Sequence, residues 1–235
     1  MNPRRLADPE LVGHRKVDIA YSEIKRALIT GIYEFGAELS VTALAEELGA
    51  SRQPVMEALK RLETERFVEI VPQVGCRVAV PLPGEVEDFY EVFATMEGLV
   101  SRLAAERRTD EDLRQLKDAV NNLTSSLRGN SFDLARYADL NREFHGLVHR
   151  SARSREARLA AEMYWDRSDF MIASTRPPFW KVNLSRARSE HKELYEAIRG
   201  QDASFAQQKA EQHIRSFGAA VVAHLASAHG VDGGT

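Results

Sequence analysis

Three of the seven histidines occur where their imidazoles could together hold a metal ion. His191 and His213 each fall within an apolar stripe of a predicted helix, so both side chains should point into the protein. His145 follows Asn141 by four residues, a spacing that places both on one helix face. Neutral imidazole suits Zn²⁺, Ni²⁺ and Cu²⁺, and an amide oxygen can add a ligand. The sequence therefore predicts a metal site formed by His145, His191 and His213, with Asn141 or water as a further ligand.

The heights of two histidines along their helices support this prediction. His191 precedes Gly200 by nine residues, roughly 13 Å along a helix. His213 follows Asp202 by 11 residues, roughly 16 Å back along the next helix. An antiparallel pair joined at Gly200 would bring both imidazoles to a similar height, and a third helix would add His145. The alternative is that these are core histidines held by hydrogen bonds.

A second group of residues could read DNA. Ser51, Arg52 and Gln53 stand at the start of a predicted helix, where Pro54 is tolerable in the first turn. Arginine can pair bidentately with guanine and glutamine with adenine, while serine can bind a phosphate. In a helix-turn-helix, the first residues of the second helix meet the base edges. We therefore predict DNA contacts from Ser51, Arg52 and Gln53; the alternative is an ordinary three-helix fold with a capped third helix.

Three helices and a hairpin are predicted around these residues. Helices are expected at 19–31, at 40–49 and from Ser51, whose hydroxyl suits a helix N-cap. Short β-branched runs at 67–71 and 76–80, joined by turn residues, predict a hairpin. Three helices followed by a hairpin within about 65 residues form a winged helix-turn-helix pattern.

The rest of the chain has helical periodicity throughout. About six helices are predicted, held together by facing apolar stripes, one of which contains Leu159, Met163 and Phe170. We therefore expect a mostly α fold. Its expected organisation is a flexible basic arm at 1–16, a winged helix-turn-helix domain at 17–80, a linker at 81–84, an all-α domain at 85–229 and a disordered tail at 230–235.

Composition narrows the class of protein. The 235 residues include 32 Lys and Arg against 35 Asp and Glu, a formal charge of −3, which excludes a polybasic nucleic-acid binder and a strongly acidic disordered chain. The single cysteine, Cys76, excludes a disulfide framework and fits a reducing cytosol. No apolar run approaches the roughly 18 residues that span a bilayer, and the N-terminal stretch lacks a secretory signal. We expect a cytoplasmic protein with no membrane partner.

Residues 49–59, which read GASRQPVMEAL, resemble the GntR transcription regulators, whose usual pattern there is LGVSRTPVREAL. A wing glycine, Gly75, fits the same pattern, and the all-α remainder resembles the FadR-type ligand domain called FCD. The resemblance covers about residues 17–225. It implies a homodimer, not an enzyme, that binds pseudo-palindromic operator DNA under the control of a small-molecule effector, often a carboxylate. Thr42 and Gly75 join the DNA-binding candidates by their places in the motif.

Several positions depart from the family pattern. Thr42, Met56 and Val74 stand where these regulators usually have arginines. Residues 1–80 hold 11 basic and 12 acidic side chains, a low balance for a DNA-binding domain. Fewer phosphate contacts flatten the salt dependence of binding. We therefore expect operator binding that is weak per protomer and that depends on dimerisation and on the Arg4 and Arg5 arm.

The resemblance also bears on the metal site. Metal-binding FCD proteins carry Asp-x-x-x-His followed by two more histidines about 22 residues apart, which matches Asn141, His145, His191 and His213 in this chain. Zinc or nickel is the implied cofactor, and asparagine in place of aspartate removes an anionic ligand and should weaken its binding. His149, one helical turn past His145, is an alternative ligand for which we expect a surface position.

Two residues are candidates for effector binding. Phe93 stands where the first FCD helix usually has an arginine, so a bidentate carboxylate clamp is missing. Arg167 could substitute for it. The alternatives are a core role for Phe93 and a solvated side chain for Arg167. We expect an effector with a larger apolar part than a simple dicarboxylate.

Two other function classes fit some of these features. A metal-dependent hydrolase could use a His₃ zinc site, but no carboxylate is evidently placed as a general base, and HEXXH, GxSxG and P-loop patterns are absent. An interaction protein whose winged helix does not bind DNA would fit the missing arginines at Thr42, Met56 and Val74.

Overall fold

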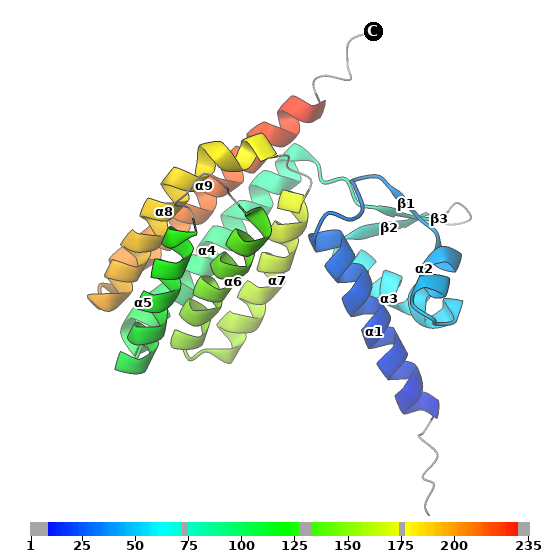
Figure 1. Cartoon of the computed structure of the whole chain (residues 1–235), viewed down its shortest axis with the longest axis horizontal. Coiled ribbons are helices and arrows are strands. Elements are labelled where there is room, and N and C mark those ends of the chain that lie inside the picture. The colour runs from blue at the N-terminus through cyan, green and yellow to red at the C-terminus, as the bar shows by residue number, and fades with distance from the viewer. Residues whose placement is uncertain (1–8, 72–74, 127–132, 174–176, 230–235) are drawn as a thin grey trace, which may run out of the picture. The chain divides into compact units, whose positions relative to one another are not determined.

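A computed structural model describes residues 9–71, 75–126, 133–173 and 177–229 (Figure 1). These residues form nine helices and one three-stranded sheet, so the mostly α fold predicted from the sequence is confirmed. The chain divides into two units. The first consists of Met1–Pro81 with Asp166–Ser174, and the second of Leu82–Trp165 with Thr175–Thr235. The break between Pro81 and Leu82 falls inside the stretch expected as a linker.

The first unit is a three-helix fold with a small sheet (Figure 1). Its sheet has the order β1-β3-β2 and is antiparallel throughout. The core is apolar and is filled from the helices and the sheet together, including Leu28, Leu59, Phe67 and Val78. The elements are α1 (Pro9–Ile29), β1 (Glu38–Leu39), α2 (Val41–Glu47), α3 (Arg52–Thr64), β2 (Val68–Val71) and β3 (Gly75–Val78).

Local chemistry explains the turn between α2 and α3. Ser40 caps α2, because its side-chain oxygen accepts a hydrogen bond from the Ala43 N–H at 3.3 Å. Gly49 follows the helix with φ +58°, a left-handed conformation that glycine adopts without strain. The chain then enters α3 after Ser51. The helices at 40–49 and from Ser51 are therefore confirmed as predicted.

Two predictions for this unit need correction. The first helix begins at Pro9 rather than at Ile19, so residues 9–16 of the expected flexible arm are helical. Proline is favourable in a first turn because its φ is already helical, and the polar sequence that follows does not prevent a helix. The short strand β1 was not predicted, because two residues are too few to show a periodic pattern. Arg4 and Arg5 lie outside the described residues.

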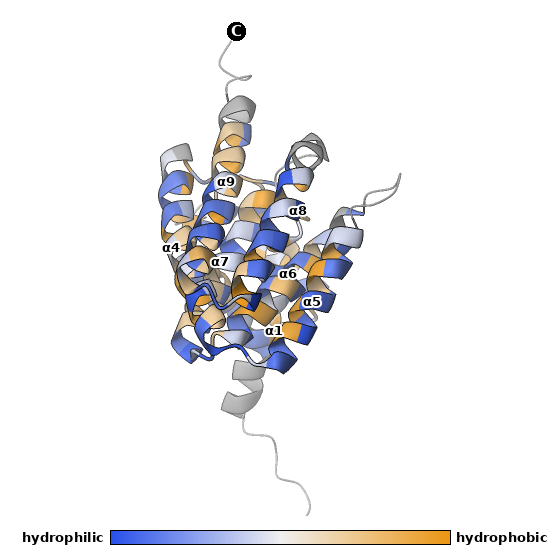
Figure 2. Cartoon of the chain, turned by 90° about the vertical axis from the view of Figure 1, so that its left-hand side faces the viewer, coloured by the Kyte–Doolittle hydropathy of each residue, from blue (hydrophilic) through white to orange (hydrophobic). Residues whose placement is uncertain are grey.

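The second unit is all helical (Figure 1) and has the expected number of about six helices. Hydrophilic and hydrophobic residues alternate along α5 and α6, as expected for helices that turn one face to a core (Figure 2). Asp133 caps α6 by accepting the Arg136 N–H. The helices are α4 (Pro83–Arg107), α5 (Asp110–Ser125), α6 (Leu134–Ser151), α7 (Arg155–Ala173), α8 (Pro177–Arg199) and α9 (Ala203–His229). The part of α7 from Asp166 on belongs to the first unit, and α4 begins inside the expected 81–84 linker.

The contact between α4 and α9 depends on small residues. A Cβ atom added at Gly218 would lie 2.4 Å from the Tyr90 Cγ, so only glycine leaves room for that ring. At Gly98 an added Cβ would lie 2.6 Å from the Glu211 Cγ. The two helices therefore approach each other closely, which brings α9 and its residue His213 toward the interior of the unit.

The predicted buried face of α7 is partly wrong. Leu159 and Met163 are 46% and 53% exposed. Ala157, Ala161 and Trp165 are buried instead, while Phe170 is buried as predicted. Both sets have i,i+4 spacing, so the periodicity of the segment alone does not distinguish the two faces. No helix in the described part of the chain is long and apolar enough to cross a membrane.

Candidate functional site

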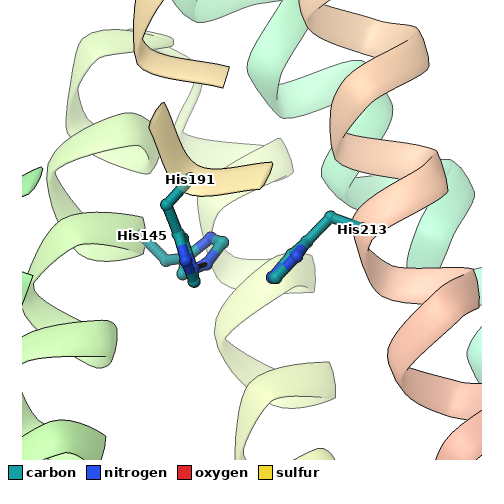
Figure 3. Close-up of side chains that lie close together, drawn as sticks. All are labelled: His145, His191 and His213. Carbon is teal, nitrogen blue, oxygen red and sulfur yellow. Dashed lines mark hydrogen bonds between the residues drawn. The ribbon is translucent and has the colours of Figure 1, made fainter. Parts of the chain in front are cut away.

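Three histidines from three helices meet inside the second unit. His145 lies on α6, His191 on α8 and His213 on α9, and their rings point toward one another (Figure 3). Their exposed fractions are 2%, 1% and 7%, and one ring nitrogen from each lies within 4.8 Å of the others. The structure therefore brings together three of the four predicted ligands, including the pair whose heights were matched by counting along the helices.

Neighbouring acceptors determine which ring nitrogen carries the proton in two of these histidines. His191 Nδ1 lies 2.6 Å from the Ala187 carbonyl oxygen, which can only accept, so this nitrogen donates. His213 Nδ1 lies 2.7 Å from Glu190 Oε2, which as a carboxylate oxygen also accepts. With the proton on Nδ1, each neutral ring keeps its lone pair on Nε2. Carbonyl and carboxylate partners of this kind commonly orient histidines that bind metals.

His145 faces two acceptors at once. Its Nε2 lies 3.1 Å from His191 Nε2, which carries a lone pair. Its Nδ1 is buried without a hydrogen-bond partner among the described residues and faces Glu97 Oε2 at 3.5 Å, too far for a good hydrogen bond. A neutral imidazole has one proton and cannot donate to both. A cation bound by the two Nε2 atoms removes the conflict, since the His145 proton is then free to stay on Nδ1. Two nitrogens bound to one tetrahedral zinc at about 2.0–2.1 Å are roughly 3.3 Å apart, so the donor set fits such an ion.

Burial keeps these rings in the form that binds metals. Burial lowers the pKa of His145 to about 4, although the hydrogen bond and charge of Glu97 oppose the shift. Burial also holds the pKa of His191 well below its ordinary value, with further lowering from the charges of His213 and His145. Imidazole must be neutral to bind a metal. At neutral pH both rings are therefore neutral, the form that could bind a metal.

A buried carboxylate adjoins the cluster. Glu97 on α4 is 1% exposed, and its Oε1 accepts hydrogen bonds from His149 Nε2 and Trp165 Nε1, both at 2.8 Å. Burial alone would raise the pKa of Glu97, but the charge of His149 and the hydrogen bonds of His145 and His149 hold it well below its ordinary value. The surface position expected for His149 is wrong, because its ring is needed inside to satisfy this carboxylate.

Sequence reasoning missed Glu97, Trp165 and Glu190. A signal for Glu97 exists: it falls among buried residues of α4, between Phe93 and Val100, where a charged side chain requires partners. Asn141, the fourth predicted ligand, is half-buried on α6 one turn before His145. Its role as a ligand stays a prediction.

The two effector candidates belong to different units of the chain. Phe93 is buried among aromatic rings, stacked on Tyr164 at 5.9 Å between centroids and edge-on to Trp165 at 5.4 Å. Phe93 is therefore a core residue, which is the alternative considered for it from the sequence. Arg167 lies on α7 within Asp166–Ser174, the segment assigned to the first unit. Effector contacts of either residue stay predictions.

The DNA-reading candidates lie at the exposed start of α3. Ser51, Arg52 and Gln53 are all exposed, and Gln53 Nε2 donates to Glu57 Oε1 at 3.3 Å. Ser51 occupies the N-cap position with an extended backbone, but its side chain makes no capping hydrogen bond, contrary to the expectation. The reason lies three residues on, where Pro54 has no N–H to donate. The Ser51 hydroxyl is therefore not engaged in capping α3.

The remaining candidates of this surface differ in accessibility. Thr42, in the first turn of α2, and Gly75, at the start of β3 with φ +146°, are exposed. Met56 is half-buried and packs against the core of the unit, so it is poorly placed to replace an arginine. Val74 lies outside the described residues.

Comparisons with known proteins agree with this two-part organisation. Residues 16–78 match the model described as "Bacterial regulatory proteins, gntR family", and residues 88–216 match the model of the FCD domain. An uncharacterized HTH-type transcriptional regulator from the TAR-I ttuE-ttuC' intergenic region of Agrobacterium vitis is 33% identical over 60% of this chain and 88% of its own length.

Other similar proteins extend the comparison. The galactonate operon transcriptional repressor of Escherichia coli is 26% identical over 86% of this chain and 94% of its own length. Some other curated relatives match over only about half of their length. Among solved structures, Escherichia coli McbR/YncC superposes with a TM-score of 0.73 at 20% identity, covering 91% of this chain and 98% of that one, which supports a shared fold.

Proposed function

The chain belongs to the GntR family of bacterial regulatory proteins and carries an FCD domain, and from this we propose that it is a transcription regulator controlled by an effector and a metal. The winged helix would bind operator DNA as part of a homodimer. The helical unit would bind a small molecule together with a divalent transition metal. The observation that carries the metal part is the 3.1 Å contact between the Nε2 atoms of His145 and His191. The other ring nitrogen of His145, Nδ1, faces the carboxylate of Glu97.

The DNA-binding part is supported by the exposed start of α3. Arg52 presents its guanidinium from the first turn of the helix that, in this motif, enters the major groove. Gln53 and the hydroxyl of Ser51 stand beside it. The exposed N-terminal turn adds backbone N–H groups that favour a phosphate.

The metal part is supported by the chemistry of the donor set. His145, His191 and His213 would hold the ion, with Asn141 as the predicted fourth ligand. All three histidines are imidazole donors, which suits zinc or nickel. When bound, the ion would supply a Lewis-acidic position for a carboxylate of the effector. The aromatic surroundings of Phe93 favour an effector with an apolar part beside that carboxylate.

The test of DNA binding begins with an operator selected from random duplexes by the full-length protein at low salt. Arg52→Ala should weaken binding to that operator by about 1–3 kcal/mol, which is roughly 5- to 150-fold. Arg102→Ala is the matched control, since Arg102 forms an ion pair with Glu106 on α4 in the other unit. Equal binding by Arg52→Ala and wild type would contradict the proposal. Failure to select any duplex would favour the interaction protein without DNA binding.

The test of metal and effector control uses protein purified without chelator. Elemental analysis should find zinc or nickel near one equivalent per chain. A thermal-shift screen of the metal-loaded protein should then identify stabilising carboxylates with an apolar part, and these should change operator affinity. Stabilisation by small polyacids alone would contradict the effector class, and absence of metal binding would contradict the metal part.

A further inference from the structure

We propose that Glu97 is a positioning residue of the metal centre, holding His145 as an Nε2 donor and supplying negative charge that the ligands lack. The inference rests on the metal site proposed above. It concerns a residue of α4, whereas the predicted ligands come from α6, α8 and α9.

The two oxygens of Glu97 have different partners. Oε1 accepts from His149 Nε2 and from Trp165 Nε1, each at 2.8 Å. These two bonds, from α6 and α7, fix the carboxylate group in the interior of the unit. Oε2 is thereby directed at His145 Nδ1, 3.5 Å away. The carboxylate is therefore held in place through Oε1, while Oε2 faces His145, one of the proposed metal ligands.

The proton of His145 links Glu97 to the ion. With Nε2 bound to a cation, the single proton of the neutral ring stays on Nδ1 and can be donated to Glu97 Oε2. Such a bond, formed when the 3.5 Å gap closes slightly, would fix the orientation of the ring and make Nε2 a stronger donor. Without the carboxylate, the same proton has no acceptor on that side. Metal affinity should therefore fall when the negative charge at Glu97 is removed.

The lack of negative charge among the predicted ligands is a second reason to expect a role for Glu97. The three imidazoles are neutral ligands, and Asn141 contributes no charge at the position where an aspartate is usual in similar proteins. Glu97 is 1% exposed, so water screens its field very little. Glu190, which holds His213, has a side chain that is 14% exposed and is better screened. Of these two carboxylates, Glu97 should have the larger effect on a bound cation.

The experiment measures the zinc affinity of the full-length protein by competition with a chromophoric chelator. Glu97→Gln should weaken zinc binding by about 10- to 100-fold, the range found for partners of metal-binding histidines. Glu91→Gln is the matched control: it is the same change on the same helix, at an exposed residue that pairs with Arg215. It should leave zinc affinity unchanged. Circular dichroism of each variant reports whether the fold is intact.

A second pair of variants separates positioning from folding. If Glu97→Gln does not fold, the double change Glu97→Gln with His149→Gln removes both members of the buried pair and leaves no uncompensated charge. It should show the same loss of zinc affinity. Adding Asn141→Asp to Glu97→Gln should restore at least part of the affinity, because a carboxylate returns to the site. Asn141→Asp alone is the reference, because an added carboxylate ligand raises zinc affinity in any background; a larger gain beside Glu97→Gln than in wild type supports the charge role, and an equal gain contradicts it.

The outcomes distinguish the two proposals. If wild type binds zinc and Glu97→Gln binds it within threefold, the role of Glu97 is overturned while the metal site stands. If wild type does not bind zinc or nickel, the proposed metal function fails and the role of Glu97 falls with it. A loss of affinity in Glu97→Gln that Asn141→Asp reverses by more than it raises affinity in wild type supports both.

Discussion

His145 and His191, 46 positions apart in the sequence, present their Nε2 atoms to each other at 3.1 Å in the interior of the helical unit. His191 is oriented by a backbone carbonyl of its own helix, that of Ala187. The orientation of the His191 ring is therefore local, whereas the place of His145 beside it depends on α4 and α5, each of which packs against both α6 and α8. In the proposed metal site, these two facing nitrogens would supply two of the four ligands of a tetrahedral ion.

Removing the metal should lower the melting temperature. An ion whose free concentration is 100 times its dissociation constant stabilises the folded protein that binds it by about 2.7 kcal/mol. Zinc should therefore raise the melting temperature of chelator-treated protein, measured by differential scanning fluorimetry. His191→Ala should abolish this increase, while His224→Ala, on α9 outside the cluster, should keep it. An equal zinc response in His191→Ala would count against the three-histidine site.

Two serines at helix starts should respond differently to alanine. Ser40 makes a capping bond to Ala43, so Ser40→Ala should cost about 1 kcal/mol of stability in urea unfolding. Ser51 makes no capping bond, so Ser51→Ala should cost less than about 0.5 kcal/mol. Operator affinity should show the reverse order, falling more for Ser51→Ala than for Ser40→Ala. A large stability loss at Ser51 would mean that its hydroxyl does cap α3 in solution.

Two helical glycines should also differ. Gly218→Ala would place a Cβ 2.4 Å from the Tyr90 ring, and overpacking of this kind costs about 1–3 kcal/mol. At Gly146 the nearest atom is the flexible Arg150 Nη1 at 3.4 Å, and alanine is a better helix former by about 0.5–1 kcal/mol. Urea unfolding should thus show Gly218→Ala destabilised and Gly146→Ala unchanged or stabilised. Tolerance of alanine at Gly218 would contradict the close approach of α4 and α9.

Cys76 gives a pH-dependent prediction. Burial, with the charge of Glu63, raises the pKa of this thiol to about 11. The thiolate is the reactive form, so iodoacetamide at pH 8.5 should label the native protein far more slowly than urea-unfolded protein, as followed by mass spectrometry. Because the folded state keeps its thiol proton where the unfolded state has lost it, this group reduces stability as pH rises from about 8.5 toward 11. Equal labelling rates for native and unfolded protein would contradict the buried position.

The elements that sequence patterns predicted well are those with repeated local signals. The 11 residues from Asp202 to His213 and the nine from His191 to Gly200 could be counted because both helices are regular and share one turn. Glu97 could not be assigned in this way. Its partners come from α6 and α7, and no local pattern predicts which helices will meet around one carboxylate.

The buried face of α7 illustrates a different limit. Leu159 and Met163 have the spacing and size of core residues, yet the helix turns Ala157 and Ala161 inward. Hydrophobicity alone favours the larger pair, whereas close packing of neighbouring helices favours the smaller one. The surrounding helices determine which of the two faces is buried, so the sequence of the segment alone does not predict it.

The burial of the three histidines bears on how fast a metal could come and go. Rings that are 2%, 1% and 7% exposed have little direct contact with solvent, so exchange of an ion bound there would be aided by transient separation of α6, α8 and α9. A metal held in this way would act as a resident part of the protein, and the variable signal would be left to the proposed small-molecule effector.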